Sequence, residues 1–177
     1  MSREDRIMFV VVPAGGRQHV SWIEHSVSVV GHSVLGAPHS GNVVGWQLVT
    51  SNGRSICRSV AFQADFDGAL RALDDLRVSI AELDVSATIR PSDHLYGWWA
   101  RLDGRPAIVG ARWYSSIRDN RAAIEVALRS LVSARLETGK AALGETGHHN
   151  EQSRSQSVPV HVDAAVDSSL PPTLGAS

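Results

Sequence analysis

The sequence has little of what stabilises secreted proteins or anchors a chain in a membrane. Its 177 residues include a single cysteine, Cys57, which excludes an intramolecular disulfide and a cysteine-based zinc site. The apolar run near the N-terminus covers only residues 7–12 and stops at Pro13, so it is too short for a signal peptide or a membrane-spanning helix. These absences predict a cytoplasmic, reduced setting and no membrane partner.

Lysine is also almost absent, because one lysine stands against sixteen arginines. The formal net charge is -1 at pH 7, so the overall charge does not indicate binding to nucleic acid or to an anionic membrane. A GC-rich gene is the simplest explanation of the arginine excess. Arginine nevertheless pairs with carboxylate and phosphate through two parallel hydrogen bonds, so its clustering along the chain matters.

Residues 1–44 form an N-terminal segment that is rich in valine, glycine and histidine, and we expect it to contain one to three strands. The apolar run at residues 7–12 predicts a buried strand. The valines between Val20 and Val29, together with Trp22, suggest one or two further strands. The glycines and the proline of residues 31–41 are typical of a loop.

Residues 45–85 predict a β-hairpin followed by a helix. The strands are expected at residues 45–51 and 54–62, on either side of an Asn52-Gly53 turn. Beyond Gly68 the apolar spacing changes to that of a helix, and its apolar face carries Leu70, Leu73, Leu76, Ile80 and Leu83. Asp65 and Asp67 are candidate helix N-caps.

Residues 96–136 repeat this pattern after a linker at residues 86–95. Strands are expected at residues 96–102 and 105–114 around an Asp103-Gly104 turn, and Ser115, Ser116 or Asp119 would cap the helix that follows. Gly97-Trp98 matches Gly45-Trp46 at a period of about 52 residues. The chain is therefore predicted to contain two copies of one unit. Residues 138–177 lack apolar periodicity and predict a disordered tail.

The hairpin motifs resemble the YegP-like family of short bacterial domains, which often occur as tandem repeats. The first copy carries Trp46-Gln47-Leu48, Asn52-Gly53-Arg54, Ile56 and Ser59, and the second carries Trp98, Asp103-Gly104, Ile108, Tyr114-Ser115-Ser116 and Ala122-Ala123-Ile124. The resemblance covers roughly residues 44–136. The sequence departs from the family pattern at the Asp-Gly turn, at Phe62 in place of tyrosine, and at Pro106, which suggests an edge strand or a bulge.

The resemblance implies an α+β fold of two tandem βββα repeats, which form an antiparallel sheet with two helices packed on one face. Such a sheet would have six strands, and a strand from residues 1–30 could extend it. The opposite sheet face would then be uncovered. The resemblance implies no activity and no catalytic residues.

Motifs that would indicate catalysis or metal binding are weak. His19, His25, His32 and His39 lack the spacing of a ligand set, and we interpret them as surface histidines. The glycines around Ser33 do not have the spacing of a nucleophile elbow. The turn at residues 13–17 lacks the lysine of a phosphate-binding loop. The sequence thus predicts no catalytic residue, no metal and no cofactor, and it favours a protein that is not an enzyme.

Arginine and tryptophan cluster in the second copy. Residues 90–135 contain eight arginines and four acidic residues, a net charge of +4, whereas residues 41–89 contain four arginines and six acidic residues, a net charge of -2. The candidate binding surface is formed by Trp99, Arg101, Arg105, Arg112, Trp113 and Tyr114. An uncovered sheet face with these side chains favours self-association as a homodimer. The alternative is nucleic-acid or nucleotide binding, with bases stacked on tryptophan and phosphates paired with arginine.

Overall fold

The computed structural model describes residues 4–31 and 40–142, which form a seven-stranded sheet and three α-helices. In chain order the elements are β1 (Arg6–Pro13), α1 (Arg17–Val30), β2 (Asn42–Val49), β3 (Ser55–Ser59), α2 (Phe66–Val78), the short 3₁₀ helix η1 (Ile80–Glu82), β4 (Asp84–Arg90), β5 (Leu95–Leu102), β6 (Arg105–Gly110), α3 (Ile117–Ser133) and β7 (Arg135–Ala142). All of them belong to one unit of the chain. None of the helices in these two ranges is long and apolar enough to cross a bilayer.

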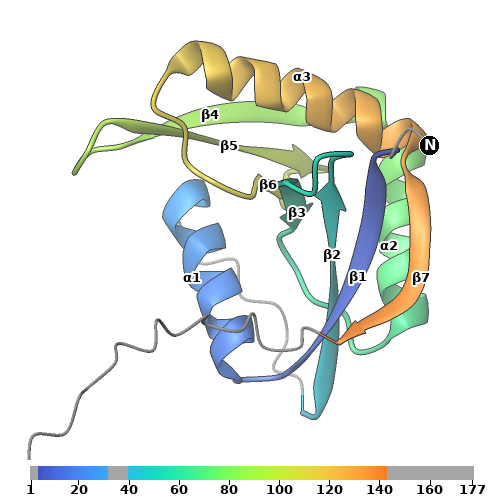
Figure 1. Cartoon of the computed structure of the whole chain (residues 1–177). Coiled ribbons are helices and arrows are strands. Elements are labelled where there is room, and N and C mark those ends of the chain that lie inside the picture. Colours follow the sequence, from blue (N-terminus) through green and yellow to red (C-terminus); the bar gives the residue numbers. More distant parts are fainter. Residues whose placement is uncertain (1–3, 32–39, 143–177) are drawn as a thin grey trace, which may run out of the picture. The chain divides into compact units, whose positions relative to one another are not determined.

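The sheet has the strand order β4-β5-β6-β3-β2-β1-β7 (Figure 1). Its neighbouring strands are antiparallel except for β1 and β7, which are parallel. The two predicted hairpins, β2–β3 and β5–β6, meet where β3 pairs with β6. The α+β class is therefore confirmed, with one strand more than the resemblance implied.

Two segments that were predicted to be irregular form edge strands instead. The predicted linker at residues 86–95 was wrong over its first part, because β4 continues to Arg90 and pairs with β5 along its whole length. The predicted disordered tail was wrong over residues 138–142, because β7 pairs with β1 up to Ala142. Neither strand has a strong apolar pattern. Both lie at an edge of the sheet and form through backbone pairing with one neighbouring strand. Residues 143–177 lie outside the described part of the chain.

The strands expected between Val20 and Val29 were wrong, because residues 17–30 form the helix α1. Its buried side chains are Trp22, Ser26, Val29 and Val30, spaced as on one face of a helix. Valine has a high strand propensity, but burial of this face against the sheet overrides it. Gly31, with φ +84°, ends the helix in the left-handed conformation.

The other two helices follow the sequence prediction more closely. The side chain of Asp65 accepts a hydrogen bond from the Gly68 N–H, and that of Ser116 accepts one from the Asp119 N–H. Helix α2 is shorter than predicted. Ile80 and Leu83 follow its last residue and still pack against the core.

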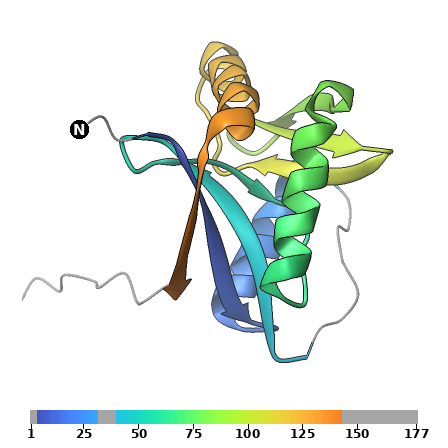
Figure 2. The same cartoon turned by 90° about the vertical axis from the view of Figure 1, so that its right-hand side faces the viewer.

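Both faces of the sheet are covered, in three layers. Helices α2 and α3 pack on one face, over a core that includes Phe9, Trp46 and Trp98. Helix α1 lies on the opposite face (Figures 1 and 2), where its Trp22 packs with Phe62. The uncovered face expected from the sequence was wrong, because residues 17–30 supply a third helix.

Candidate ligand-binding cavity

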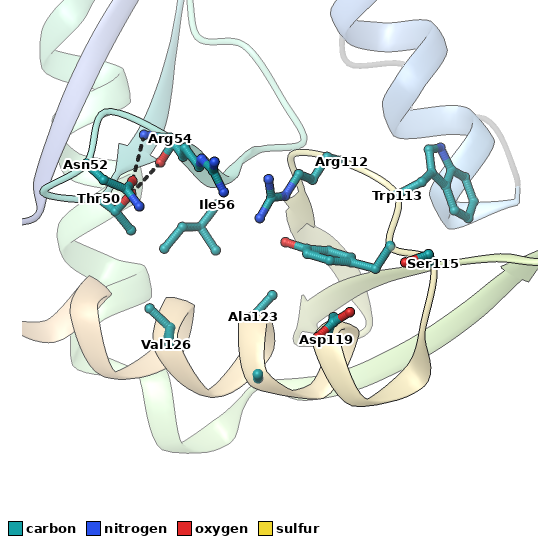
Figure 3. Close-up of a pocket in the computed structure, with 12 residues that line it drawn as sticks. Thr50, Asn52, Arg54, Ile56, Arg112, Trp113, Ser115, Asp119, Ala123 and Val126 are labelled. Atoms are coloured by element: carbon teal, nitrogen blue, oxygen red, sulfur yellow. Dashed lines mark hydrogen bonds between the residues drawn. The ribbon is translucent and has the colours of Figure 1, made fainter.

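A cavity of about 470 Å³ lies between the β2–β3 turn, the β6–α3 loop and the N-terminal half of α3 (Figure 3). It is therefore lined partly by the first predicted hairpin and partly by the second hairpin and its helix. Its lining residues are Thr50, Asn52, Arg54, Ile56, Arg112, Trp113, Tyr114, Ser115, Asp119, Ala122, Ala123 and Val126.

The β2–β3 turn presents Arg54 at the cavity. The Thr50 N–H donates to the Arg54 carbonyl at 2.9 Å, and the Asn52 Oδ1 accepts from the Arg54 N–H at 3.2 Å. Gly53 has φ +82°, whereas Asn52 is not in the left-handed region. In the other predicted turn, Asp103-Gly104, both residues are left-handed. The side chains of this longer turn fix the backbone from which Arg54 extends.

The β6–α3 loop contributes Arg112 and Tyr114. Tyr114 exchanges two backbone hydrogen bonds with Tyr96, both at 2.8 Å, and only 7% of the residue is exposed. The Arg112 guanidinium carbon lies 5.0 Å from the centre of the Tyr114 ring. The Tyr114 hydroxyl is buried, and it has no hydrogen-bond partner among residues 4–31 and 40–142. A buried hydroxyl without a partner is rare in folded proteins.

Asp5 holds two walls of the cavity together. One of its carboxylate oxygens accepts from the Ser51 N–H at 2.9 Å, within the β2–β3 turn. The other accepts from the Ser130 hydroxyl of α3 at 2.6 Å. The turn that carries Arg54 is thereby fixed relative to the helix that faces it.

The charge of the cavity is positive. Arg54 and Arg112 are exposed, and within the described ranges no carboxylate lies within 4 Å of either guanidinium. Figure 3 shows both guanidinium groups directed toward each other. Asp119 also lines the cavity, and it accepts a hydrogen bond from the Ser116 hydroxyl at 2.8 Å. Two cations and one anion leave a net charge of +1 in the lining.

The six residues of the predicted binding surface do not form one surface. Arg112, Trp113 and Tyr114 line the cavity, although the Trp113 side chain points away from it toward α1 in Figure 3. Trp99, like Trp113, packs against the cluster of Val29, Val60 and Val109 on the α1 face. Arg101 pairs with Asp84, and the exposed Arg105 begins β6 beside the Asp103-Gly104 turn. Their binding role remains a prediction.

Pro106 lies in an interior strand, so the edge-strand alternative was wrong. The register of β5 and β6 shifts between Ala100 and Arg101, beside the Arg101–Pro106 pair. This irregularity accommodates the missing N–H of proline, as the bulge alternative predicted.

His25 is not a surface histidine, because it lies between α1 and the sheet. Its Nε2 hydrogen-bonds to the Gly110 carbonyl at 2.8 Å. Burial lowers the pKa of His25, and it outweighs the hydrogen bond to Gly110, which raises it. His32, His39 and Ser33 lie outside the described residues. In the part of the chain that the structure describes, no three His, Cys, Asp or Glu side chains are grouped as a metal site would require.

The fold and the cavity define a three-layer α+β protein with a cavity between its β2–β3 turn and α3. No protein-family model and no curated protein matches the chain. Among solved structures, a UPF0339 protein from Shewanella oneidensis is similar, with a TM-score of 0.51 and 12% identity over 84% of this chain and 99% of that one. The protein of unknown function yegP from E. coli is similar with a TM-score of 0.46 and 12% identity, over 57% of this chain and 86% of that one.

The fold of the Shewanella oneidensis protein is consistent with the resemblance of the hairpin motifs to the YegP-like family. At 12% identity the likeness shows the fold alone. The chemistry of the cavity must therefore be argued from its own residues.

Proposed function

We propose that this protein is a small, non-enzymatic binding module, and that its ligand occupies the cavity between the β2–β3 turn and α3. The buried Tyr114 hydroxyl carries the proposal, because it lacks a hydrogen-bond partner among the described residues beside a cavity of about 470 Å³. A ligand in the cavity would supply an acceptor for it. Among the described residues, neither lining hydroxyl, that of Thr50 or that of Ser115, is hydrogen-bonded to a carboxylate or a histidine, so the arrangement favours binding over catalysis.

We also propose that the cavity lies at the junction of two copies of one unit. In the first, a Cβ on Gly45 would come within 3.0 Å of the Phe62 ring; in the second, a Cβ on Gly97 would come within 2.9 Å of the Trp113 ring. The same packing of an aromatic ring on a strand glycine thus occurs at matching positions. The strand order β4-β5-β6-β3-β2-β1 is also symmetric about the β3–β6 pair.

A smaller cavity of about 150 Å³ supports this interpretation. It lies between α2 and the start of β6, as the larger one lies between α3 and the start of β3. Its lining includes Ala61 and Gln63, which precede Arg112 and Tyr114 by 51 residues each. The arginine and the tyrosine are therefore specific to the larger cavity, as expected if only that one binds a ligand.

The test is a thermal-shift panel of charged and neutral metabolites, because a compound that binds only the folded state raises the melting temperature. The variant Ala123→Phe places a ring in the cavity and should abolish the shift that an active compound gives. Ala72→Phe is the matched control, since Ala72 lies at the corresponding position of α2 and lines the smaller cavity. The proposal is wrong if no compound stabilises the protein, or if Ala123→Phe responds like the wild type.

Self-association and nucleic-acid binding stay predictions, but both assumed an uncovered sheet face. Helix α1 covers that face, and it packs near Trp99 and Trp113. The cavity is for this reason the better-supported site. The cytoplasmic location also stays a prediction from sequence.

A further inference from the structure

We infer that the ligand of this cavity is a small organic monoanion, with a carboxylate held by Arg54 and Arg112 and an apolar body along Ile56, Ala123 and Val126. This inference rests on the proposed function and names the chemical class of its ligand.

The two arginines supply the attraction for an anion. Each extends from a loop at one side of the cavity, Arg54 after the β2–β3 turn and Arg112 before α3 (Figure 3). By contrast, Arg6 pairs with Glu137, Arg90 with Asp93 and Arg101 with Asp84. Two guanidinium groups that face each other without a carboxylate repel, and a ligand oxyanion between them removes that repulsion.

The Tyr114 hydroxyl adds a neutral donor beside them. The Arg112 guanidinium lies over the Tyr114 ring, so the phenol and this cation are held next to each other. The phenol is buried, and no residue in the described ranges accepts its proton. A carboxylate that bridges the two arginines offers a further lone pair, which would satisfy this donor.

The charge balance favours a carboxylate over a phosphate. Asp119 lines the same cavity and reduces the two positive charges to a net +1. A carboxylate carries one negative charge and neutralises this lining. A phosphate monoester carries up to two at neutral pH, so its second charge would face the Asp119 carboxylate without compensation.

The remaining wall is apolar. Ile56 comes from β3, and Ala123 and Val126 come from the facing side of α3. An alkyl or aryl group attached to the carboxylate would bury apolar surface there. A cavity with an apolar wall and a few convergent polar groups is typical of small-molecule sites.

The experiment is an amide NMR titration of the full chain with hexanoate, and with hexanol and inorganic phosphate as comparison probes. Hexanoate should shift amides in the β2–β3 turn and at the start of α3. Hexanol, which lacks the charge, should bind about tenfold or more weakly, and phosphate should also bind more weakly than hexanoate.

Variants then assign the contacts. Arg54→Gln and Arg112→Gln should each weaken hexanoate about tenfold or more, and Tyr114→Phe should weaken it less. Arg105→Gln is the matched control, because Arg105 follows the other hairpin turn and does not line the cavity. It should leave the affinity unchanged.

The inference is overturned if hexanoate does not bind at millimolar concentration, if hexanol or phosphate binds as tightly, or if Arg54→Gln and Arg112→Gln behave like Arg105→Gln. A different compound that stabilises the wild type but not Ala123→Phe would then leave the proposed function intact. Failure of every compound in that panel would remove both.

Discussion

The Asp5 carboxylate and the Ser130 hydroxyl are joined by a hydrogen bond of 2.6 Å, although 125 residues separate them in the chain. The same carboxylate accepts a hydrogen bond from the Ser51 N–H of the β2–β3 turn. Asp5 stands just before β1, so the start of the first strand connects the turn to α3. This side chain therefore links the turn that carries Arg54 to the helix that faces it.

Replacing Asp5 with alanine should therefore loosen the cavity as well as the fold. We expect Asp5→Ala to lower the free energy of unfolding by about 1–3 kcal/mol, since two hydrogen bonds to a charged group are lost. It should also broaden the amide NMR signals of the β2–β3 turn. Denaturant unfolding measures the first effect. Ser130→Ala, which removes only one of the bonds, should give a smaller loss, and an equal or larger one would contradict this assignment.

Gly97 is predicted to tolerate no side chain. A Cβ there would lie 2.9 Å from the Trp113 ring and 3.2 Å from the Thr88 methyl group. Gly97→Ala should destabilise the protein by about 1–3 kcal/mol, because the indole cannot move without disturbing the packing beneath α1. In a Trp113→Leu background the same change should cost less. Additive losses in this double-mutant cycle would show that the ring is not the cause.

Arg58 carries a half-buried charge, and we expect this charge to destabilise the fold. Its guanidinium lies 4.5 Å from the centre of the Trp22 ring, and burial lowers its pKa to about 10. Its buried Nε has no hydrogen-bond partner among the residues described. Arg58→Met keeps the packing on Trp22 and removes the charge, so we expect an unchanged or higher melting temperature. A clear drop in melting temperature would mean that the guanidinium stabilises α1.

The stability of the protein should depend on pH through His25. Burial lowers the pKa of His25 in the folded state, so its protonation is favoured in the unfolded chain. The stability should be complete above the unfolded pKa of about 6.5 and should fall as the pH drops below it. His25→Gln keeps a donor for the Gly110 carbonyl but does not titrate. Urea unfolding gives the free energy of unfolding at about pH 8 and at about pH 5. Between these two pH values it should fall less for this variant than for the wild type. An equal fall in both proteins would mean that another group titrates.

Much of the fold could be predicted from local patterns. Turn residues at 52–53 and 103–104 located both hairpins, and the change of apolar spacing after Gly68 located α2. These signals are local, because turn chemistry and helix capping depend on residues a few positions apart. The strands β4 and β7 were missed, since edge strands form through backbone pairing with partners that are distant in the chain.

The candidate site could be predicted only in part. Arg112 and Tyr114 were among the predicted binding residues, because arginine and aromatic residues cluster within residues 90–135. Arg54 was missed, because its relevance depends on the pairing of β3 with β6, which brings the first hairpin to the second. Trp99 and Arg101 were included because an uncovered face was expected.

The sequence by itself determined the α+β class, the two hairpins and the helix that follows each of them, because turns, caps and apolar periodicity are properties of neighbouring residues. Only the tertiary structure decided that residues 17–30 form a helix over the second sheet face, since burial against β5 and β6 outweighs the strand propensity of their valines. It also decided where the candidate cavity lies. Arg54 and Arg112 line the same cavity because β3 lies next to β6 in the sheet, and no local sequence pattern predicts this strand order.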